Sequence, residues 1–550
     1  GCFATCRVKE IDLKSDNVVF SKKGNYIYRK DKKALAVGVV NGNTAVIPEG
    51  IEELNQDSVL IGQNISKVTL PSSLKCLRGA WLDMGNMDDC VFEFKSTTED
   101  KDLPSDILDL LPDPISGIKK GDKVMLTLKN RYEFWFTMVA LHKIGAVAIP
   151  ATHMLKLHDI DFRIKNANVK LIVTVEEDRL IPDYEEAQKE LGTDLVKCVI
   201  ERDLDGWINF NKAIEEESDE FERPTGDDEV LADDISLIYF TSGTSGLPKM
   251  VAHKQTYGLG HIPTAKYWHK VEEDGIHHTA ADTGWGKAVW GNFYGQWIAG
   301  SAVFIYDYDR FNGIKLLEKV IENKVNTFCA PPTIYRFLIK ENIKGYDFSN
   351  IHHVTTAGEP LPPEVSKRFK EISGLRIKEG FGQTETVLTI ATFDWIDAKL
   401  GSIGKPSPLF DVKLLNENDE EVDIGQEGEI CIDVSHGISP GLFKEYYKNP
   451  EKQAAQWHDG YYHCGDTAWK DEDGYIHFIG RNDDIIKSSG YRIGPYEVES
   501  AVLSHESVSN CAITAYPDEI RGQIVKATII LQPGYEGSEE LKKEIIKMTK

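Results

Sequence analysis

Residues Tyr239–Met250 read YFTSGTSGLPKM, and this stretch says most about the fold and chemistry of the chain. The run that leads into it, Ile235–Phe240, is apolar and rich in β-branched residues, which predicts a buried strand. Hydroxyl residues and glycines follow, and then Pro248 and Lys249. Glycine lets backbone N–H groups approach an anion, while hydroxyls and a lysine add donors and charge. The pattern therefore predicts a phosphate-binding loop, with a flexible surface loop as the alternative.

Two later segments carry related chemistry. Residues Lys378–Thr386 read KEGFGQTET, and residues Tyr461–Ser500 contain CGDTA, GRNDD and SGYRIGP. In this order the three segments resemble the adenylate-forming superfamily, which includes acyl-CoA synthetases, luciferases and the adenylation domains of peptide synthetases. The resemblance extends over residues 118–550, and within it Lys143–Leu155 and Gly284–Phe311 are most similar to medium-chain acyl-CoA synthetases of the butyrate–CoA ligase type.

The resemblance implies an α/β fold, the adenylate-forming enzyme fold, with two domains. A large multi-sheet α/β domain over residues 118–481, lacking the family's usual first elements, would precede a small mobile α+β domain over residues 482–550, truncated at its end. The residues agree with an α/β chain, since Phe134–Ala151 reads as a helix followed by a buried strand. Charged residues interrupt this stretch, so we do not expect a membrane span.

The first 96 residues predict a separate β-rich segment. VIPEGIEEL at Val46–Leu54 recurs as TLPSSLKCL at Thr69–Leu77, so that Ile47 and Leu70 lie 23 residues apart. A period of this length predicts a solenoid, and the unit resembles the leucine-rich repeats of bacterial surface proteins. Residues 97–117 are acidic and contain prolines, which predicts a linker to the large domain.

The composition of the chain excludes several classes of binding partner and site. Sixty-three basic and 88 acidic residues give a net charge of −25, so no basic surface is expected for nucleic acid or anionic lipid. A polyanion such as ATP or CoA must then be met by local donors and Mg²⁺. Nine scattered cysteines without a CxxC pair indicate reduced thiols in a cytoplasmic enzyme rather than disulfides or a zinc site. We read the doublets His277-His278 and His352-His353 as structural, and no signal peptide follows Gly1.

A free carboxylate is a poor electrophile, so its conversion to a thioester needs activation. Attack on the α-phosphate of ATP gives an acyl-adenylate and pyrophosphate, and a thiol then displaces AMP. The protein must align these groups and neutralise charge on the phosphate oxygens. Mg²⁺ prefers hard oxygen ligands, so Glu385 is the expected metal ligand. With the resemblance, the predicted catalytic residues are Thr241, Lys249, Thr384, Glu385 and Arg492.

The resemblance also implies the nucleotide and CoA contacts. Asp466 would accept hydrogen bonds from both ribose hydroxyls, and Arg492 would offer a planar fork to phosphate oxygens. The predicted phosphate loop consists of Thr241, Ser242, Gly243, Thr244, Ser245, Gly246 and Lys249. The other predicted contacts are Gly358, Glu359 and Pro360 at the adenine, Gln383, Thr384, Asp466, Arg481 and Arg492 around the nucleotide, and Ser489, Gly490 and Tyr491 at the pantetheine tunnel. Asp483 is the expected hinge between the domains.

Acyl specificity depends on Gly382, the residue before Gln383. Acetate-specific relatives carry a tryptophan at the matching position, so glycine is expected to leave the pocket open for acids from butyrate to medium length. Trp285, Trp290 and Val387 are expected to line this pocket, with an ordinary core role as the alternative.

The predicted function is ATP-dependent conversion of a short- or medium-chain carboxylic acid to its acyl-CoA, with AMP and pyrophosphate as products. The alternatives are an adenylation domain that loads a carrier protein, and a repeat-bearing binding protein with an inactive ligase. The family's PKTxSGKI-like segment, whose lysine contacts the α-phosphate, does not occur before Lys550. Loss of one such charge costs on the order of several kcal/mol of barrier, so we expect impaired adenylation in this chain.

Overall fold

The computed structural model describes residues 117–550 except 178, 216, 218–220, 242–247, 309, 342, 483, 489–490, 519–520 and 550. Before them it describes nine short strands between residues 20 and 94, together with residues 47, 48 and 51. The chain divides into two compact units, Gly1–Ser105 and Asp106–Lys550. The domain boundaries expected at residues 96, 117 and 481 stay predictions.

The first unit contains the predicted repeat. Its strands are β1 (Phe20–Lys23), β2 (Tyr26–Arg29), β3 (Leu35–Val39), β4 (Thr44–Val46), β5 (Glu53–Leu54), β6 (Val59–Ile61), β7 (Lys67–Leu70), β8 (Cys76–Leu77) and β9 (Val91–Phe94). β1 and β2 form an antiparallel pair, whereas β4 pairs in parallel with β7, and β5 with β8. Thr44 faces Lys67 and Glu53 faces Cys76, so each turn of chain advances by the 23 residues seen in the sequence. Stacked parallel strands at a fixed period are the geometry of a solenoid.

The second unit begins with an eight-stranded sheet in the order β14-β13-β12-β10-β11-β15-β16-β26. Its strands are β10 (Lys123–Thr127), β11 (Val147–Pro150), β12 (Val169–Thr174), β13 (Val196–Val199), β14 (Ile208–Asn209), β15 (Ile235–Thr241), β16 (Lys249–Lys254) and β26 (Glu445–Tyr446). The pairs from β14 to β15 are parallel, and β16 and β26 are antiparallel additions. The predicted strand before the glycine-rich loop is confirmed as β15.

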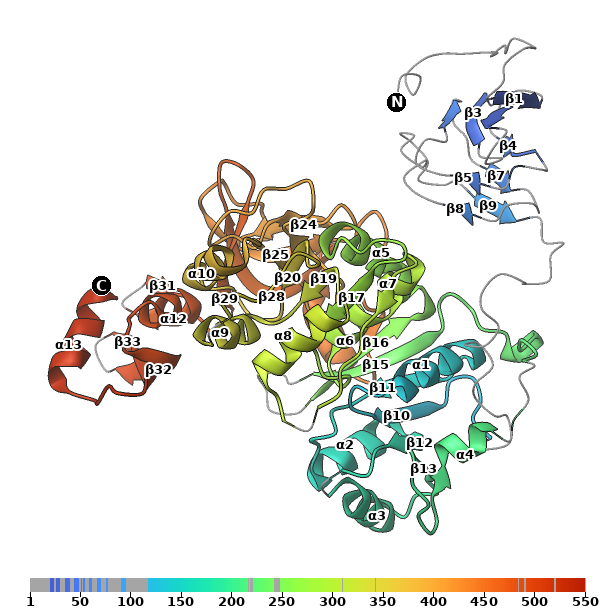
Figure 1. Cartoon of the computed structure of the whole chain (residues 1–550), viewed down its shortest axis with the longest axis horizontal. Helices are drawn as coiled ribbons and strands as arrows, with labels where there is room; N and C mark the ends of the chain where they lie inside the picture. Colours follow the sequence, from blue (N-terminus) through green and yellow to red (C-terminus); the bar gives the residue numbers. More distant parts are fainter. Residues whose placement is uncertain are drawn as a thin grey trace. The chain divides into compact units, whose positions relative to one another are not determined.

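Helices cover both faces of this sheet. α1 (Tyr132–Ile144) lies on one side, and α2 (Leu157–Ala167) and α3 (Leu180–Leu191) lie on the other (Figure 1). This arrangement follows from right-handed crossovers, because the chain reverses its direction across the sheet after β11. α1 followed by β11 confirms the predicted helix and buried strand within Phe134–Ala151. The short helix α4 (Phe210–Glu215) ends this part of the chain.

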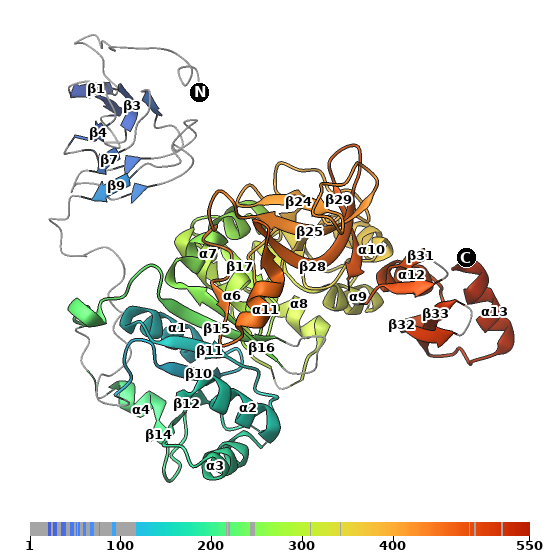
Figure 2. The ribbon, with the colours of Figure 1, turned by 180° about the vertical axis from the view of Figure 1, so that it is seen from behind.

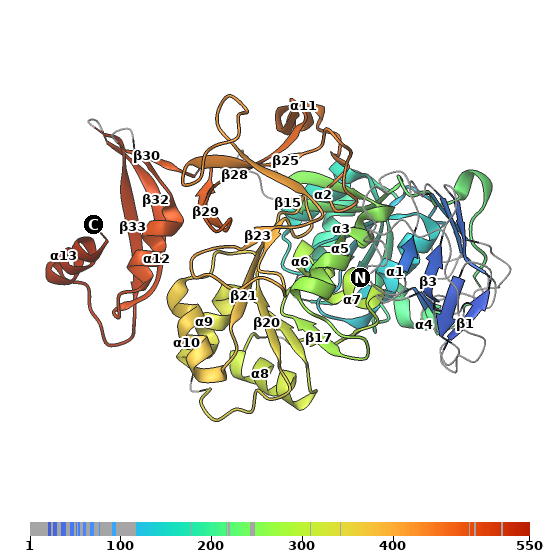
Figure 3. The same ribbon diagram turned by 90° about the horizontal axis from the view of Figure 1, so that it is seen from above.

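A second sheet has seven strands in the order β18-β17-β19-β20-β21-β22-β23. They are β17 (Ile276–Thr279), β18 (Ala302–Val303), β19 (Thr327–Cys329), β20 (His353–Thr356), β21 (Ile377–Phe381), β22 (Ile390–Ala391) and β23 (Lys405–Pro406). The helices α8 (Gly313–Glu322), α9 (Pro332–Lys340) and α10 (Pro363–Ser373) lie together along one side of it (Figure 3). Their buried faces meet the strands in one apolar cluster that includes Leu317, Tyr335 and Phe369. The short helix α5 (His261–Pro263) lies between β16 and β17, and α6 (Gly286–Asn292) and α7 (Tyr294–Ile298) lie between β17 and β18.

A third, antiparallel sheet completes the large region, and Figure 2 shows it from behind. It contains β24 (Asp411–Leu415), β25 (Glu427–Asp433), β28 (Tyr461–Lys470), β27 (Trp457–His458) and, paired with β28, β29 (Ile476–Arg481); α11 (Pro450–Gln456) precedes β27. After it come the last elements of the chain: β30 (Ile486–Ser488), β31 (Tyr491–Ile493), α12 (Pro495–Leu503), β32 (Val508–Asp518), β33 (Gly522–Leu531) and α13 (Glu539–Met548). They form a four-stranded sheet with two helices around a small core that includes Ile486, Val502 and Ile545. A large α/β domain with a small α+β domain after it is the predicted fold class.

Candidate active site

One cavity of about 560 Å³ collects residues from all three sheets of the large region. Of the residues predicted to form the site, the following line this cavity: Thr241, Lys249, Trp285, Trp290, Gly358, Glu359, Pro360, Gly382, Gln383, Thr384, Glu385, Asp466 and Arg481. They are separated by up to 240 positions in the chain. Their convergence on one hollow is therefore a property of the fold and not of sequence proximity.

The phosphate-loop segment lies at the end of β15. β15 runs parallel to β11, and the carboxyl ends of parallel strands are where α/β sheets place their ligands. β16 then returns antiparallel, with Thr241 directly opposite Lys249. Both residues line the cavity. The predicted loop residues Ser242, Gly243, Thr244, Ser245 and Gly246, between these two, lie outside the described residues.

A buried carboxylate faces this end of the sheet. Glu385 is 7% exposed, and one of its oxygens lies 4.0 Å from the Lys249 Nζ atom. Tyr446, on β26, donates a hydrogen bond of 2.7 Å to the same oxygen, and burial raises the pKa of this tyrosine. The Glu385 carboxylate is thus fixed in direction beside a cation. A phosphate bound in the cavity against these two groups would meet a positive charge and an anchor for Mg²⁺.

A second group of hydrogen bonds fixes Asp466. Gln383 Nε2 donates to Asp466 Oδ2 and, at 2.7 Å, to the carbonyl oxygen of Cys464. Tyr462 OH in turn donates to Gln383 Oε1 at 2.9 Å. Asp466 and Arg481 are cross-strand partners on β28 and β29, with Arg481 Nη1 3.8 Å from the carboxylate. The result is a nearly buried carboxylate at the cavity wall, held by a neutral donor on one side and a cation on the other.

The segment Gly358-Glu359-Pro360 follows β20. Gly358 has φ +95°, a conformation that side chains disfavour, so glycine is required by the backbone here. The Glu359 carboxylate accepts a hydrogen bond of 2.8 Å from Thr333 and lies 3.5 Å from Arg336, both on α9. The side chain is therefore tied to α9, while the segment itself forms part of the cavity wall.

Gly382 and Trp290 both line the cavity, and they pack against each other. A Cβ atom at this position would lie 2.6 Å from the carbonyl oxygen of Val387 and even closer to the ring of Trp290. The position that a Cβ atom of residue 382 would take is thus occupied by Trp290 and by the Val387 carbonyl, and Trp290 Nε1 donates a 3.0 Å hydrogen bond to Tyr257. The open acyl pocket stays a prediction. Val387 is fully buried behind this glycine and does not appear in the described cavity lining, whereas Trp285 is 63% exposed at the edge.

Sequence reasoning missed two ionisable groups in the cavity. Lys287 donates a hydrogen bond of 2.7 Å to the Ala357 carbonyl, and burial lowers its pKa. Burial raises the pKa of Glu379 to about 8. A 2.9 Å hydrogen bond from the Leu361 amide to its carboxylate acts in the opposite direction, but the effect of burial is larger. Both residues stand inside quoted segments, GWGK and KEGFGQ, so their proximity to recognised residues was the available signal.

The comparisons with known proteins agree with this geometry. The family described as AMP-binding enzyme matches residues 115–447, and the AMP-binding enzyme C-terminal domain matches residues 497–550. The chain belongs to the AMP-binding enzyme family. The mouse acyl-coenzyme A synthetase ACSM3 is 39% identical over 434 residues, covering 78% of this chain and 74% of its own. The human acyl-coenzyme A synthetase ACSM5 is 37% identical over 425 residues, covering 77% and 72%.

Solved structures of AMP-binding enzymes give the same result. An acyl-CoA synthetase of Brucella canis is 30% identical and superposes with a TM-score of 0.61 over 78% of each chain. The anthranilate CoA ligase AuaEII, solved with anthranoyl-AMP, is 25% identical with a TM-score of 0.72, covering 78% of this chain and 81% of its own. The expected family, fold class and enzyme class, an AMP-forming acyl-CoA synthetase, are confirmed.

The family expected for the N-terminal segment is corrected. The SHIRT domain family matches residues 88–133, and the comparisons support this domain near the N-terminus rather than leucine-rich repeats. The 23-residue period itself remains visible in the parallel strands of the first unit. The period of a repeat gives the number of residues in each turn of the chain, so the repeat could be predicted from the sequence. Many unrelated families share such a period, so it could not identify the family.

The remaining predicted residues of this AMP-binding enzyme lie after β29. Asp483, Ser489 and Gly490 are outside the described residues. Tyr491 and Arg492 stand on β31, in an antiparallel pair with β30, and their side chains are not described.

Within the described part of the chain, none of the helices has the length and apolar character that crossing a membrane requires.

Proposed function

We propose that this AMP-binding enzyme activates a short- or medium-chain carboxylic acid with ATP and Mg²⁺ and transfers the acyl group to CoA. The observation that carries the proposal is the single cavity in which Lys249 and Glu385 face Asp466 and Arg481. Lys249 and Glu385 suit a polyphosphate with its Mg²⁺, and Asp466 and Arg481 suit a ribose. The relatives named acyl-coenzyme A synthetases supply the second substrate, CoA, by analogy.

In the first half-reaction a carboxylate oxygen of the acid attacks the α-phosphorus of ATP. The bond from that phosphorus to the bridging oxygen breaks, and pyrophosphate leaves with the electron pair. Lys249 stands where it neutralises charge on the phosphate oxygens, and Thr241 offers a hydroxyl donor beside it. Mg²⁺, which binds one or two carboxylates together with substrate phosphates, fits the Glu385 carboxylate and would further neutralise the polyphosphate.

In the second half-reaction the CoA thiol loses its proton and its sulfur attacks the acyl carbon of the adenylate. The bond from that carbon to the phosphate oxygen breaks, and AMP leaves. Asp466, buried and oriented by Gln383, holds the ribose through both steps. Since the ribose does not react, this contact acts by positioning, and its loss should raise the KM for ATP more than it lowers kcat.

The acid is the least defined substrate. Trp290 and Gly382 pack against each other and both line the cavity, so the acyl chain would pass beside the Trp290 ring. A preference for acids longer than acetate stays our proposal, and the ratio of turnover with hexanoate to turnover with acetate tests it. A ratio below one would refute it.

Carboxylate-dependent exchange of labelled pyrophosphate into ATP, measured across a panel of acids, tests the function as a whole. Lys249→Ala should reduce exchange at least a hundredfold, on the scale of losing one preorganised charge. Lys254→Ala is the matched control, because Lys254 stands on the same strand, pairs with Asp233 at 2.6 Å and is not among the described residues that line the cavity. Equal loss in both variants, or exchange independent of acid, would contradict the proposal.

Two outcomes separate the alternatives. Formation of acyl-AMP without acyl-CoA, with transfer to an added carrier protein, would indicate a carrier-loading enzyme. Absence of any thermal shift with a non-hydrolysable acyl-AMP mimic would indicate a binding protein with a silent ligase.

Impaired adenylation by the 550-residue chain also stays a prediction. Comparing it with a chain that carries an added lysine-bearing PKTxSGKI segment, in both half-reactions, tests that prediction.

The cytoplasmic location stays a prediction as well. The mammalian relatives are named mitochondrial, so the compartment of this chain does not follow from theirs. Cell fractionation with an antibody against the chain would decide it.

A further inference from the structure

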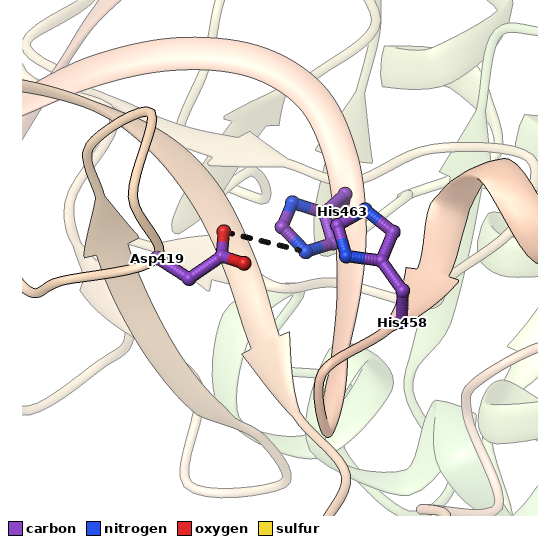
Figure 4. A group of neighbouring side chains, drawn as sticks. All are labelled: Asp419, His458 and His463. Atoms are coloured by element: carbon purple, nitrogen blue, oxygen red, sulfur yellow. Dashed lines mark ion pairs between the residues drawn. The ribbon is translucent and has the colours of Figure 1, made fainter.

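Three potential metal ligands converge on the antiparallel sheet of the large region, away from the nucleotide cavity. Asp419 stands on the turn between β24 and β25, His458 at the end of β27, and His463 on β28 (Figure 4). One ligand atom from each lies within 4.8 Å of the other two. None of the three belongs to the described lining of the cavity. The cluster is therefore a separate feature with its own chemistry.

Each of the two histidine rings has a carboxylate near its Nδ1 atom, and the two rings stack with their centroids 3.9 Å apart. His463 Nδ1 lies 3.5 Å from Glu429 Oε2, and His458 Nδ1 lies 2.9 Å from Asp459 Oδ2. A carboxylate on Nδ1 fixes the tautomer and leaves Nε2 as the electron-pair donor, which is the outer-shell arrangement of many histidine–metal sites. Both rings of the cluster have this arrangement, although their carboxylates come from different elements.

His463 also supplies an independent observation. Its side chain is 9% exposed, and its Nε2 atom is buried without a hydrogen-bond partner in the structure. Such a buried polar atom is costly unless something satisfies it. The nearest acidic atom is Asp419 Oδ1 at 3.9 Å, too far for a hydrogen bond and on the side where a shared ion would lie.

We propose that Asp419, His458 and His463 bind one divalent transition-metal ion of the Zn²⁺ class. Two imidazole nitrogens and a carboxylate are ligands that Zn²⁺ accepts, whereas Mg²⁺ and Ca²⁺ prefer oxygen alone. Zinc bonds of about 2.1 Å place tetrahedral ligand atoms roughly 3.4 Å apart, so the 3.9 Å between Asp419 and His463 needs a small contraction. The His458 ring, which stacks on His463, would turn so that its nitrogen faces the ion. A water molecule would complete the coordination.

A neighbouring set of ligands, Glu429, Cys431 and His463, competes for the same imidazole. Cys431 Sγ lies 3.4 Å from His463 Nδ1, so this sulfur is at the other ring nitrogen and not at the unpartnered Nε2 atom. Glu429 Oε1 already accepts a 2.8 Å hydrogen bond from the Gly465 amide. These contacts favour Glu429 and Cys431 as the support of His463 and favour Asp419 as the ligand.

The proposed ion would join three elements that are separate in the chain. His463 stands three residues before Asp466 on β28, so the ion would also stiffen the strand that carries the ribose-binding carboxylate. This role does not depend on the proposed ligase function. A metal that stabilises the fold would bind equally well to a protein with no catalytic activity.

Binding of Co²⁺ to the full chain, read from visible absorption and reversed by Zn²⁺, tests the proposal in a buffer with excess Mg²⁺. Asp419→Asn and His458→Gln should each weaken binding at this site at least tenfold. His158→Gln is the matched control, because that side chain is 83% exposed and outside the cluster. Subtracting the spectrum of His458→Gln from that of the wild type removes the absorption of Co²⁺ bound to cysteines elsewhere in the chain. The remaining spectrum of the proposed site should lack a sulfur-to-cobalt charge-transfer band.

Either of two results would overturn the proposal. One is binding that is identical in the wild type and in both cluster variants. The other is a difference spectrum that contains the sulfur band and loses it in Cys431→Ser, which would assign the metal to the competing set. Urea midpoints without metal show whether the variants fold, and both altered side chains are at the surface, so folding should be retained.

Discussion

Replacing Gly382 by alanine is the sharpest test of how the acyl side of the cavity is built. The added Cβ would lie 2.6 Å from the carbonyl oxygen of Val387 and closer still to the Trp290 ring. A ring can shift, but the Val387 carbonyl belongs to the backbone and can move only with the segment between β21 and β22. Overpacking of this kind costs about 1–3 kcal/mol, and since Gly382 does not use the left-handed region, the whole cost arises from space.

Gly286→Ala is the matched control for Gly382→Ala. Gly286 lines the same cavity, yet its added Cβ would come no closer than 3.9 Å to any neighbour, an ordinary contact. At the start of α6, alanine should leave the stability unchanged or raise it by about 0.4–1 kcal/mol. Urea unfolding followed by circular dichroism measures both free energies of unfolding, and pyrophosphate exchange measures the effect on the cavity.

A double-mutant cycle completes this test. Trp290→Phe removes the ring tip that Gly382→Ala would strike, so the double variant should recover part of the stability and exchange rate lost in the single one. Recovery should be incomplete, because the Val387 carbonyl stays in place. If Gly382→Ala and Gly286→Ala have equal stability, or if the cycle is additive, then the Trp290 ring does not stand where the Cβ atom of residue 382 would lie, and the tight packing around Gly382 is refuted.

Three further predictions concern the same cavity. Tyr446→Phe removes the 2.7 Å hydrogen bond to the buried Glu385 carboxylate, a bond worth about 1.5–3 kcal/mol, and should raise the Mg²⁺ concentration needed for half-maximal exchange; an unchanged Mg²⁺ dependence would contradict the role of Glu385. Asp466→Asn should raise the KM for ATP at least tenfold in steady-state assays, with Arg481→Lys as a milder change, and an effect on kcat alone would argue against ribose binding. Glu379 has a pKa raised from 4.5 to about 8, so its contribution to stability is present below about pH 4.5 and is lost, at up to about 1.4 kcal/mol per pH unit, as pH rises toward 8. Urea unfolding of Glu379→Gln should therefore show a flatter decline between those pH values than the wild type, and parallel curves would refute the raised pKa.

Local patterns predicted the parts of the fold that depend on local physics. The apolar run before the phosphate loop became β15, and the 23-residue period became the parallel ladders of the first unit. The residues Lys249, Glu385 and Asp466 were named from motifs, and the fold brings them to one cavity. Such motifs are readable because glycines, hydroxyls and charges are tied to backbone geometry and to the chemistry of phosphate.

Contacts between distant segments could not be predicted in the same way. Gly382 was expected to leave the acyl pocket open because glycine has no side chain, and this stays a prediction. The close packing of the Trp290 ring, far away in the chain, against this glycine could not be predicted from the sequence. The burial that raises the pKa of Glu379 likewise comes from its tertiary surroundings. The cluster of Asp419, His458 and His463 had no sequence signal, because its ligands come from three elements without the regular spacing of a metal motif.

The pairing of β28 with β29 links the hairpin turn between them to the position of Asp466 and Arg481 in the cavity wall. Asp466 faces Arg481 across this ladder, and Lys470 faces Ile476 next to the turn. At the turn, the Asp471 carboxylate accepts hydrogen bonds from the amides of Asp473 and Tyr475, which sets the number of residues that the bend can hold. If an insertion in this bend shifted the register of the ladder by one residue, Arg481 would point to the opposite face of the sheet, so the bend helps to place a residue of the cavity wall.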